Sequence, residues 1–563
     1  MSRAATTRGP KTLSDPGSTS RQQAKIWTPV VWILLGLAIL GTAAIRIRLL
    51  DVPFERDEGE YAYMGKLLLE GVPPYLKAYT LKLPGTLSAY ALSMSIFGES
   101  IAGARIGLVL VNGATTALMF LLGRRLLGLL PGLAAAVAFA FLSLSTGMLA
   151  IFAHATHFVL LPAVAGLLVF FKALEERRSP VLFASGLLFG IAILMKQPGA
   201  LFPAFAAYWL AHTHLRGTGP GWRKLIREGC CLALGTLTPI ALTIIALAFA
   251  GVYDRFFFWV FQYSFHYGTM VPWSIGFTLL QETAASFLPQ GVFFWGLAAL
   301  GLIMLPIRRF AIPQPLPLFA LAVFSFAGVS VGLYYRHHYF ILALPAACLL
   351  AGAAVRGLLQ ITENASARIA VPVTLLALLV AGSAQALYSQ RDLLFRLPPA
   401  TVSRSIYGMN PFPESVEIAR YIRDKTEPND TIAVLGSEPQ IYFYSGRRSA
   451  TGHIYMYNLM EPHPFALKMQ EELIRDVEAA SPAFIVTVAI PTSWLAGPHS
   501  PGRLFAWADD YLATRYDVVG RIVIGGPNFT AYLWEADAMR SLPGEMPHVL
   551  VWRRKQAGPG SHS

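Results

Sequence analysis

Residues 54–63 of this 563-residue chain read Phe-Glu-Arg-Asp-Glu-Gly-Glu-Tyr-Ala-Tyr, and they closely follow an apolar run from Trp27 to Ile45. Further along, residues 81–85 read Leu-Lys-Leu-Pro-Gly. The apolar run is long enough to cross a bilayer, for which roughly twenty apolar residues are needed. A cluster of carboxylates beside a membrane is costly unless water, a cation or a substrate balances it. This first loop, residues 51–99, is therefore the first candidate for a functional site.

The composition is that of a polytopic membrane protein. The chain is 55% hydrophobic and only 14% charged, whereas a soluble domain carries about 25% charged residues. The net charge of +13 does not indicate nucleic-acid binding, because membrane proteins concentrate Lys and Arg in their cytoplasmic loops. The sequence shows no internal repeat and no glycine-rich phosphate-binding signature, so nothing in it predicts nucleotide binding.

About eleven segments reach the length of a membrane span. They are 27–45, 101–122, 132–150, 157–173, 181–196, 198–212, 229–250, 288–306, 315–333, 339–356 and 369–388. With the N-terminus inside, the inner short loops hold most of the basic residues, such as Arg124, Arg125, Arg308 and Arg309. This positive-inside bias predicts a cytoplasmic N-terminus and an outer position for the first loop. An odd number of spans then places the C-terminal part outside as well.

The chain divides into four predicted parts: a disordered cytoplasmic tail (1–25), a helical transmembrane domain (26–390) whose first outer loop spans 50–100, a periplasmic α/β domain (391–540) and a flexible tail (541–563). In the third part, helical spacing of apolar residues alternates with β-branched runs, and this alternation is typical of an α/β domain. Helices are predicted at 413–426 and 467–480, strands at 431–435 and 483–488, and a hairpin at 521–534.

The first loop combines acidic and basic groups at one membrane boundary. Asp57 and Glu58 are adjacent, so their side chains diverge and only one of them can face a substrate. Residues 60–70 have the spacing of an amphipathic helix lying along the interface, and Asp57 would sit near its N-terminus, where the helix dipole favours an anion. Lys82 precedes a Pro-Gly pair that restricts the backbone. A base for a hydroxyl beside a cation for a phosphate is a sensible pairing; the alternative is a set of solvated charges that cap interfacial helices.

Other polar groups also lie at predicted outer ends of spans. Lys196 marks the turn between two short spans, and the segment 334–339 reads Tyr-Tyr-Arg-His-His-Tyr. The Arg336 guanidinium suits a phosphate, while the tyrosines are equally suited to an interfacial belt. His154 and His157 are interpreted as polar lining rather than a zinc site, and the adjacent His337 and His338 cannot easily ligate one metal together.

Several of these stretches resemble bacterial GT-C glycosyltransferases, namely the protein O-mannosyltransferase-like group and the lipid A aminoarabinose transferases. The matching stretches are 56–65, 67–75, 82–85, 195–199 and 335–339. The resemblance covers residues 27–390 and is most specific in the first loop. It implies a polytopic GT-C fold in the bacterial inner membrane. It also implies transfer of a sugar from a polyprenyl-phosphate donor to a lipid, glycan or protein acceptor on the periplasmic face.

The resemblance also implies roles for single residues. Asp57 is similar to the catalytic carboxylate, Lys82 to a lysine on the phosphate side, and Arg336 with Tyr335 to a late-loop phosphate contact. The other expected substrate-binding residues are Glu58, Tyr61 and Lys196.

Two departures from the family weigh against a metal. Leu81 stands where some relatives carry an acidic metal-binding residue, and Ala155-Thr156-His157 stands where many carry Asn-Thr-Glu. No metal ligand and no other cofactor is therefore predicted, with a divalent cation as the open alternative. Two other classes of function are also open. One is a transporter or flippase of a lipid-linked sugar, in which the first loop gates the transport path. The other is a membrane anchor that presents the C-terminal domain as a binding module.

Overall fold

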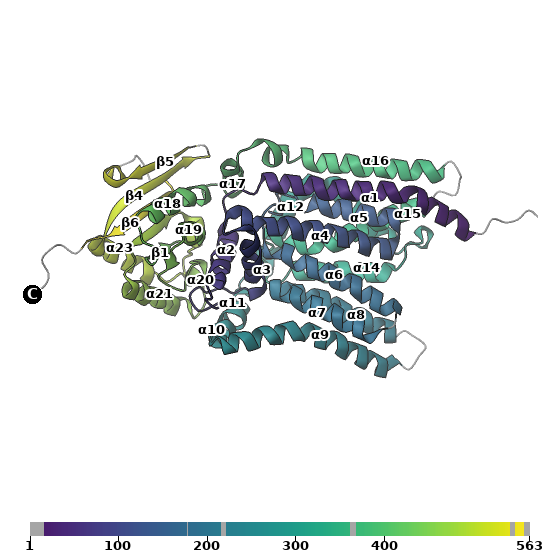
Figure 1. The fold of residues 1–563 in the computed structure, drawn as a ribbon, viewed down its shortest axis with the longest axis horizontal. Helices are drawn as coiled ribbons and strands as arrows, with labels where there is room; N and C mark the ends of the chain where they lie inside the picture. Colours follow the sequence, from purple (N-terminus) through teal and green to yellow (C-terminus); the bar gives the residue numbers. More distant parts are fainter. Residues whose placement is uncertain are drawn as a thin grey trace, which may run out of the picture.

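The computed structural model describes residues 16–176, 178–215, 221–360, 367–527, 529–540 and 546–556. In this part of the chain, a bundle of long helices carries a smaller sheet-containing domain at one end (Figure 1). The bundle helices are α1 (Pro16–Arg48), α4 (Ile101–Leu127), α5 (Leu129–Leu142), α6 (Ala155–Glu176), α7 (Ser179–Met195), α8 (Leu201–Leu215), α9 (Gly221–Phe249), α12 (Trp273–Phe287), α13 (Val292–Met304), α14 (Pro315–Val329), α15 (Leu344–Gln360) and α16 (Ala367–Tyr388).

The bundle agrees with the predicted spans. Among the described residues, seven helical segments are long and apolar enough to cross a membrane: Trp27–Arg48, Ile101–Leu127, Ala155–Glu176, Gly221–Phe249, Trp273–Met304, His337–Gln360 and Ile369–Tyr388. Three shorter apolar helices, α5, α7 and α14, join them, and each predicted span overlaps a helix. Helix α1 begins at Pro16, before the predicted boundary at residue 26. Residues 1–15 of the predicted tail lie outside the described part.

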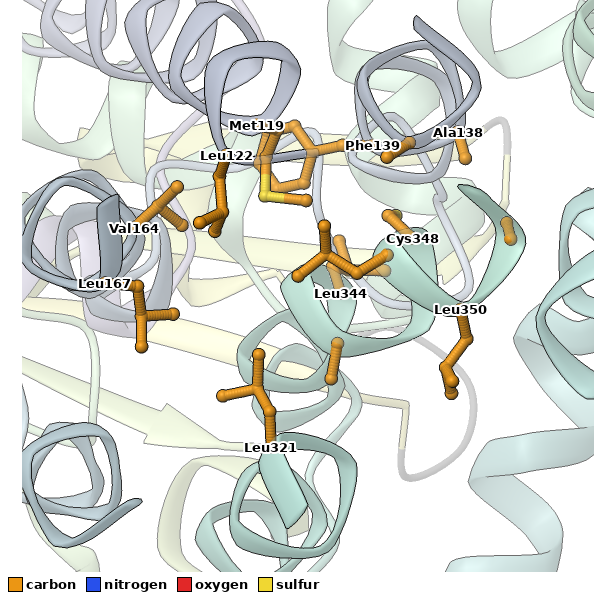
Figure 2. Packing of buried hydrophobic residues seen from close by; sticks show 14 of the residues in the cluster. Met119, Leu122, Ala138, Phe139, Val164, Leu167, Leu321, Leu344, Cys348 and Leu350 are labelled. Atoms are coloured by element: carbon orange, nitrogen blue, oxygen red, sulfur yellow. The ribbon is translucent and has the colours of Figure 1, made fainter. Parts of the chain in front are cut away.

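The centre of the bundle is a close-packed apolar core. Side chains from α4, α5, α6, α14 and α15 meet there, among them Met119, Phe139, Val164 and Leu344 (Figure 2). Small residues allow α4 and α5 to approach closely, since a Cβ on Gly132 would lie 2.5 Å from a backbone nitrogen of α4. Such small-residue contacts are the usual means of packing helices in a membrane, where apolar burial alone gives no drive toward association.

Two helices occupy the first loop, and both have local sequence causes. Helix α2 (Arg56–Leu69) begins after Glu55, whose carboxylate accepts a hydrogen bond from the Glu58 backbone N–H. Helix α3 (Pro84–Phe97) begins at Pro84, a residue favoured at the first position because a free N–H is not needed there. The first of them contains most of the helix predicted at 60–70 and begins four residues earlier. Their positions place Asp57 in the first turn of α2 and Lys82 just before α3.

The amphipathic spacing predicted that this helix lies along the lipid interface. In the structure, α2 does not lie there. The C-terminal domain covers it, and most of its residues are buried. Gly59 lies against Gln440 so closely that a Cβ would come within 2.7 Å of the Gln440 backbone nitrogen, and the rings of Tyr63 and Tyr442 are 5.1 Å apart. The apolar face of α2 therefore packs against the C-terminal domain.

The C-terminal domain is a six-stranded mixed sheet with helices, as the alternating pattern predicts. Its strand order is β2-β1-β3-β6-β4-β5. The strands are β1 (Thr431–Leu435), β2 (Arg448–Ser449), β3 (Phe484–Ala489), β4 (Tyr516–Gly526), β5 (Phe529–Trp534) and β6 (His548–Arg554). The helices include α17 (Pro399–Tyr407), α18 (Phe412–Asp424), α19 (Gln440–Ser445), α20 (Tyr457–Met460), α21 (Ala466–Ala480) and α23 (Arg503–Arg515). Val434, Val486 and Val551 stand in register across three neighbouring strands.

The predicted flexible tail at 541–563 is wrong for residues 548–554. These residues form β6, which pairs with β3 on one side and with β4 on the other. Val549 and Val551 are fully buried on one face of the sheet, so this strand completes the domain core. The domain therefore extends beyond the predicted boundary at residue 540.

Candidate active site

A cavity of about 650 Å³ lies where the bundle, the first loop and the C-terminal domain meet. The bundle and its loops line it with Lys196, Gln290, Arg336 and His338 among others, and the first loop with Asp57, Glu60 and Lys82. The C-terminal domain lines it with Tyr455, Tyr457, Asn458 and Glu461. Segments that are far apart in the sequence therefore contribute to one cavity. The elements that carry them, among them α2 and α20, lie where the bundle meets the C-terminal domain (Figure 1).

Asp57 and Lys82 form the charged centre of this cavity. The Lys82 Nζ lies 2.8 Å from the Asp57 Oδ1, also pairs with Glu60, and sits 4.5 Å from the centre of the Tyr61 ring. Burial alone would raise the pKa of Asp57, but the Lys82 ammonium outweighs it and lowers the pKa to about 2. Burial opposes the charge of Lys82 too, yet the two carboxylates keep its pKa well above the usual value. Both groups are therefore ionised at neutral pH.

Glu58 points away from the cavity, as its adjacency to Asp57 predicts. Its side chain is fully buried and accepts two hydrogen bonds from the Arg105 guanidinium, at 2.9 and 2.5 Å. It also accepts a hydrogen bond from the Ala153 backbone N–H at 2.9 Å. Glu58 thus ties α2 to α4 and to the segment before α6, and the structure does not bring it to the site where substrate binding was expected.

Two further cations line the cavity without a carboxylate partner among the described residues. Lys196 follows the last residue of α7, and its ammonium lies 4.0 Å from the centre of the Tyr339 ring. Burial lowers the pKa of Lys196 to about 7. The Arg336 guanidinium lies 5.5 Å from the Tyr334 ring and is exposed to the cavity.

The two predicted tyrosines do not line the cavity. Tyr61 is buried beneath the Lys82 ammonium. Tyr335 is buried as well; its hydroxyl donates to Ser330 and its carbonyl accepts from Thr283. Of the seven predicted site residues, the structure therefore brings together Asp57, Lys82, Lys196 and Arg336, and places the other three behind them.

Two histidines lie beside Asp57 and were not grouped with it from the sequence. His154 and His338 are stacked with ring centres 4.2 Å apart, and they lie 3.9 and 4.0 Å from the Asp57 Oδ2. Burial lowers the pKa of His154 to about 4, so its ring is neutral, and both of its nitrogens are buried without a hydrogen-bond partner among the described residues. One atom from each of these three residues falls within 4.8 Å of the others, which is a geometry that could hold a metal ion.

Nearly the whole chain is similar in fold to solved membrane-protein structures. The crystal structure of ArnT from Cupriavidus metallidurans bound to undecaprenyl phosphate matches with a TM-score of 0.58 and 16% identity, over 93% of this chain and 98% of that chain. The fold is GT-C-like. The archaeal oligosaccharyltransferase AglB from Archaeoglobus fulgidus, in complex with an inhibitory peptide and a dolichol-phosphate, matches with a TM-score of 0.53 and 12% identity, over 92% of this chain and 75% of that chain.

The sequence comparisons agree with this fold. The model of the dolichyl-phosphate-mannose-protein mannosyltransferase family matches residues 84–220. No curated protein matches the sequence. The chain thus resembles ArnT and the O-mannosyltransferases, as its first loop indicates. The GT-C-like fold also includes the C-terminal domain in the ArnT comparison, since nearly the whole of both chains is covered.

The C-terminal side of the GT-C-like cavity is the part that sequence reasoning missed. Tyr455, Tyr457, Asn458 and Glu461 follow no motif, and their segment lies far from the first loop in the chain. Burial raises the pKa of Glu461 to about 7, and its carboxylate accepts a hydrogen bond from the Tyr263 hydroxyl. The only available signal was the density of tyrosines at 455 and 457, which core packing explains equally well.

A buried ion pair fixes this domain over the cavity. The Arg56 guanidinium lies 3.0 Å from the Glu438 carboxylate, and both side chains are nearly inaccessible to solvent. Arg56 also donates to the Asn410 side chain at 2.7 Å. Because an unpaired buried charge is costly, separation of the two domains would be opposed at this point. The first loop therefore lines the cavity and also forms the surface on which the C-terminal domain packs.

Proposed function

We propose that the protein is a membrane glycosyltransferase that moves a sugar from a polyprenyl-phosphate donor to an acceptor hydroxyl. The observation that carries this proposal is the cavity in which ionised Asp57 lies among Lys82, Lys196 and Arg336. A carboxylate that can take a proton, next to cations that can hold a phosphate, is what such a transfer requires. The resemblance in fold to ArnT bound to undecaprenyl phosphate supports it.

In the proposed reaction the donor phosphate lies against Lys82, Arg336 and Lys196. The acceptor hydroxyl gives its proton to Asp57 while its oxygen bonds to the anomeric carbon, and the bond from that carbon to the phosphate oxygen breaks. The lipid phosphate leaves with the electron pair, so the anomeric carbon inverts. A phosphate that draws Lys82 away from Asp57 would also weaken the pair that lowers the pKa of this carboxylate, and the base would become stronger when donor is bound.

A divalent cation fits at Asp57 itself. Asp57, His154 and His338 would hold it, and the His154 nitrogens, which have no hydrogen-bond partner in the described part of the chain, are the structural observation in its favour. A bound cation would supply positive charge against the leaving phosphate.

The location of the cavity favours an enzyme over a transporter. The cavity lies at the end of the bundle beneath the C-terminal domain, whereas transporters place their sites near the bilayer midplane. The basic residues of the loops at the opposite end support an outer position for this end by the positive-inside rule. We place the reaction on the periplasmic side of a bacterial inner membrane, with the N-terminus cytoplasmic.

The test is a transfer assay with the purified protein, a radiolabelled polyprenyl-phosphate sugar, and lipid, glycan and protein acceptors. Lys82→Ala and Arg336→Ala should each weaken use of the donor by about ten- to a hundredfold, because a charge-assisted hydrogen bond contributes about 1.5–3 kcal/mol. Lys77→Ala is the matched control, since Lys77 is exposed in the same loop and does not line the cavity. An unchanged dependence on donor concentration in both variants would contradict the assignment of the phosphate site.

A further inference from the structure

The wall that the C-terminal domain adds to the cavity has no part in the chemistry described above. The part of it formed by Tyr455, Tyr457, Asn458 and Glu461 is called the C-terminal wall below; Ile406, Tyr407, Asn410 and Phe412 of the same domain line the cavity elsewhere. Tyr457 and Asn458 belong to the short helix α20, Tyr455 precedes it and Glu461 follows it. Tyr263, in the helical segment Phe258–Tyr263 between α9 and α12, lies against this wall, and its hydroxyl is within hydrogen-bond distance of both the Glu461 carboxylate and, at 3.0 Å, the Asn458 Oδ1.

The chemistry of this wall suits a sugar rather than a phosphate. It carries no cation: two aromatic rings can cover the C–H face of a sugar ring, and a carboxyl and an amide can bind hydroxyl groups. The Tyr455 hydroxyl makes no hydrogen bond within the described part of the chain, although the residue lines the cavity. The Asn458 Oδ1 lies against the Tyr263 hydroxyl, and the Asn458 amide hydrogens can act as donors.

The wall also lies where the donor sugar must be. A sugar bonded to the donor phosphate stays within about one ring length of it, roughly 5 Å. The Tyr455 ring lies 5.9 Å from the Lys82 Nζ, and Tyr457 and Glu461 line the same cavity as Arg336. The groups that suit a sugar therefore border the two cations assigned to the phosphate.

We propose that the C-terminal wall binds the sugar of the donor and favours a neutral sugar over a uronic acid. This inference rests on the proposed function, because the phosphate site positions the sugar. Above about pH 7, where Glu461 is ionised, a uronic acid would bring a second carboxylate against it, and two adjacent carboxylates cannot both ionise without a large cost. A neutral sugar offers hydroxyls that the Glu461 carboxyl, the Asn458 amide and the free Tyr455 hydroxyl can bind.

The experiment measures dissociation constants of the full-length protein for four probes: undecaprenyl phosphate, and its mannose, arabinose and glucuronic acid conjugates. The wild-type protein should bind at least one neutral conjugate about three- to tenfold more tightly than undecaprenyl phosphate, the gain expected from one or two hydrogen bonds. The glucuronic acid conjugate should show no such gain.

Three variants sharpen the result. Tyr455→Phe removes a hydroxyl that has no described protein partner, so it should abolish the gain for the neutral conjugate and leave the affinity for undecaprenyl phosphate unchanged. Glu461→Gln keeps an acceptor for Tyr263 and should bind the glucuronic acid conjugate better than the wild type does. Tyr253→Phe, at a tyrosine outside the cavity, is the matched control and should change nothing.

The outcomes separate the two proposals. A wild-type protein that prefers no neutral conjugate, or a Tyr455→Phe variant that retains the preference, would overturn the sugar wall. So would equal affinity for the glucuronic acid and neutral conjugates. If the wild-type protein does not bind undecaprenyl phosphate at all, or if Lys82→Ala binds it equally well, the proposed phosphate site itself fails and this inference fails with it.

Discussion

Asp57 carries a charge that its burial alone would not allow. The Lys82 ammonium at 2.8 Å holds its pKa at about 2, while Glu60, bonded to the same ammonium, has its pKa raised by burial. The two carboxylates thus share one cation unequally, and the one that faces the histidines is the one that is firmly ionised. This asymmetry supports the proposal that Asp57, among the four acidic residues of the segment 54–63, is the base.

Lys196 should make donor binding depend on pH. Burial lowers its pKa to about 7, so it is a cation below that pH and becomes neutral as the pH rises through it. We expect the affinity for undecaprenyl phosphate to fall between about pH 6 and about pH 8 as this attraction is lost.

Titration calorimetry across that range would measure the effect. Lys196→Arg keeps its charge throughout and should flatten the dependence, which separates the lysine from the titration of the lipid phosphate. The same slope in the variant and in the wild-type protein would contradict the role of Lys196.

At the level of single elements, the first loop was largely predictable and its surroundings were not. Local signals determine α2 and α3: a side-chain cap at Glu55, proline at the start of α3, and apolar spacing. The divergence of Asp57 and Glu58 follows from helix geometry alone. What covers α2 depends on residues hundreds of positions away, so the sequence predicted a lipid interface where the structure has the C-terminal domain.

The contact between α2 and α19 leaves no room for a side chain at Gly59. A Cβ there would lie 2.7 Å from the Gln440 backbone nitrogen, so Gly59→Ala should force the two helices apart. We expect the free energy of unfolding to fall by about 1–3 kcal/mol, as for other overpacked contacts. Transfer activity should also fall, because the C-terminal domain would no longer close the cavity.

Thermal unfolding of the purified variant would show the change. Gly41→Ala is the control, since a Cβ at Gly41 of α1 meets no atom within 4 Å. Equal melting temperatures for the two variants would contradict the close packing of the C-terminal domain on α2.

Strand β6 gives a second test at this level. It lies between β3 and β4, with Val549 and Val551 buried, so a chain that ends at residue 547 should lose the fold of its C-terminal domain. A chain that ends at residue 556 keeps the whole strand and should behave like the full protein. Limited proteolysis would distinguish them, and resistance of the shorter chain would contradict the structural role of β6.

At the scale of the whole molecule, the sequence predicted the membrane class and the spans because hydropathy is a local property. It also identified four of the residues that line the cavity. The meeting of Asp57 with His154 and His338 was not predictable, because three segments must fold together before their side chains lie within reach. The contribution of the C-terminal domain to the cavity was not predictable for the same reason. Strand β6 was missed because it follows a polar segment with two prolines, Pro543 and Pro547.

The central claim is that Asp57 is the base of a sugar transfer carried out in this cavity. The most direct measurement compares the wild-type protein with Asp57→Asn in the transfer assay, at saturating donor and acceptor. Asparagine keeps the shape of the side chain but cannot accept the proton, so the rate should fall by about a hundred- to ten-thousandfold. Asp51→Asn, at an exposed position of the same loop, should retain full activity. Transfer at the wild-type rate by a folded, membrane-inserted Asp57→Asn protein would contradict the account.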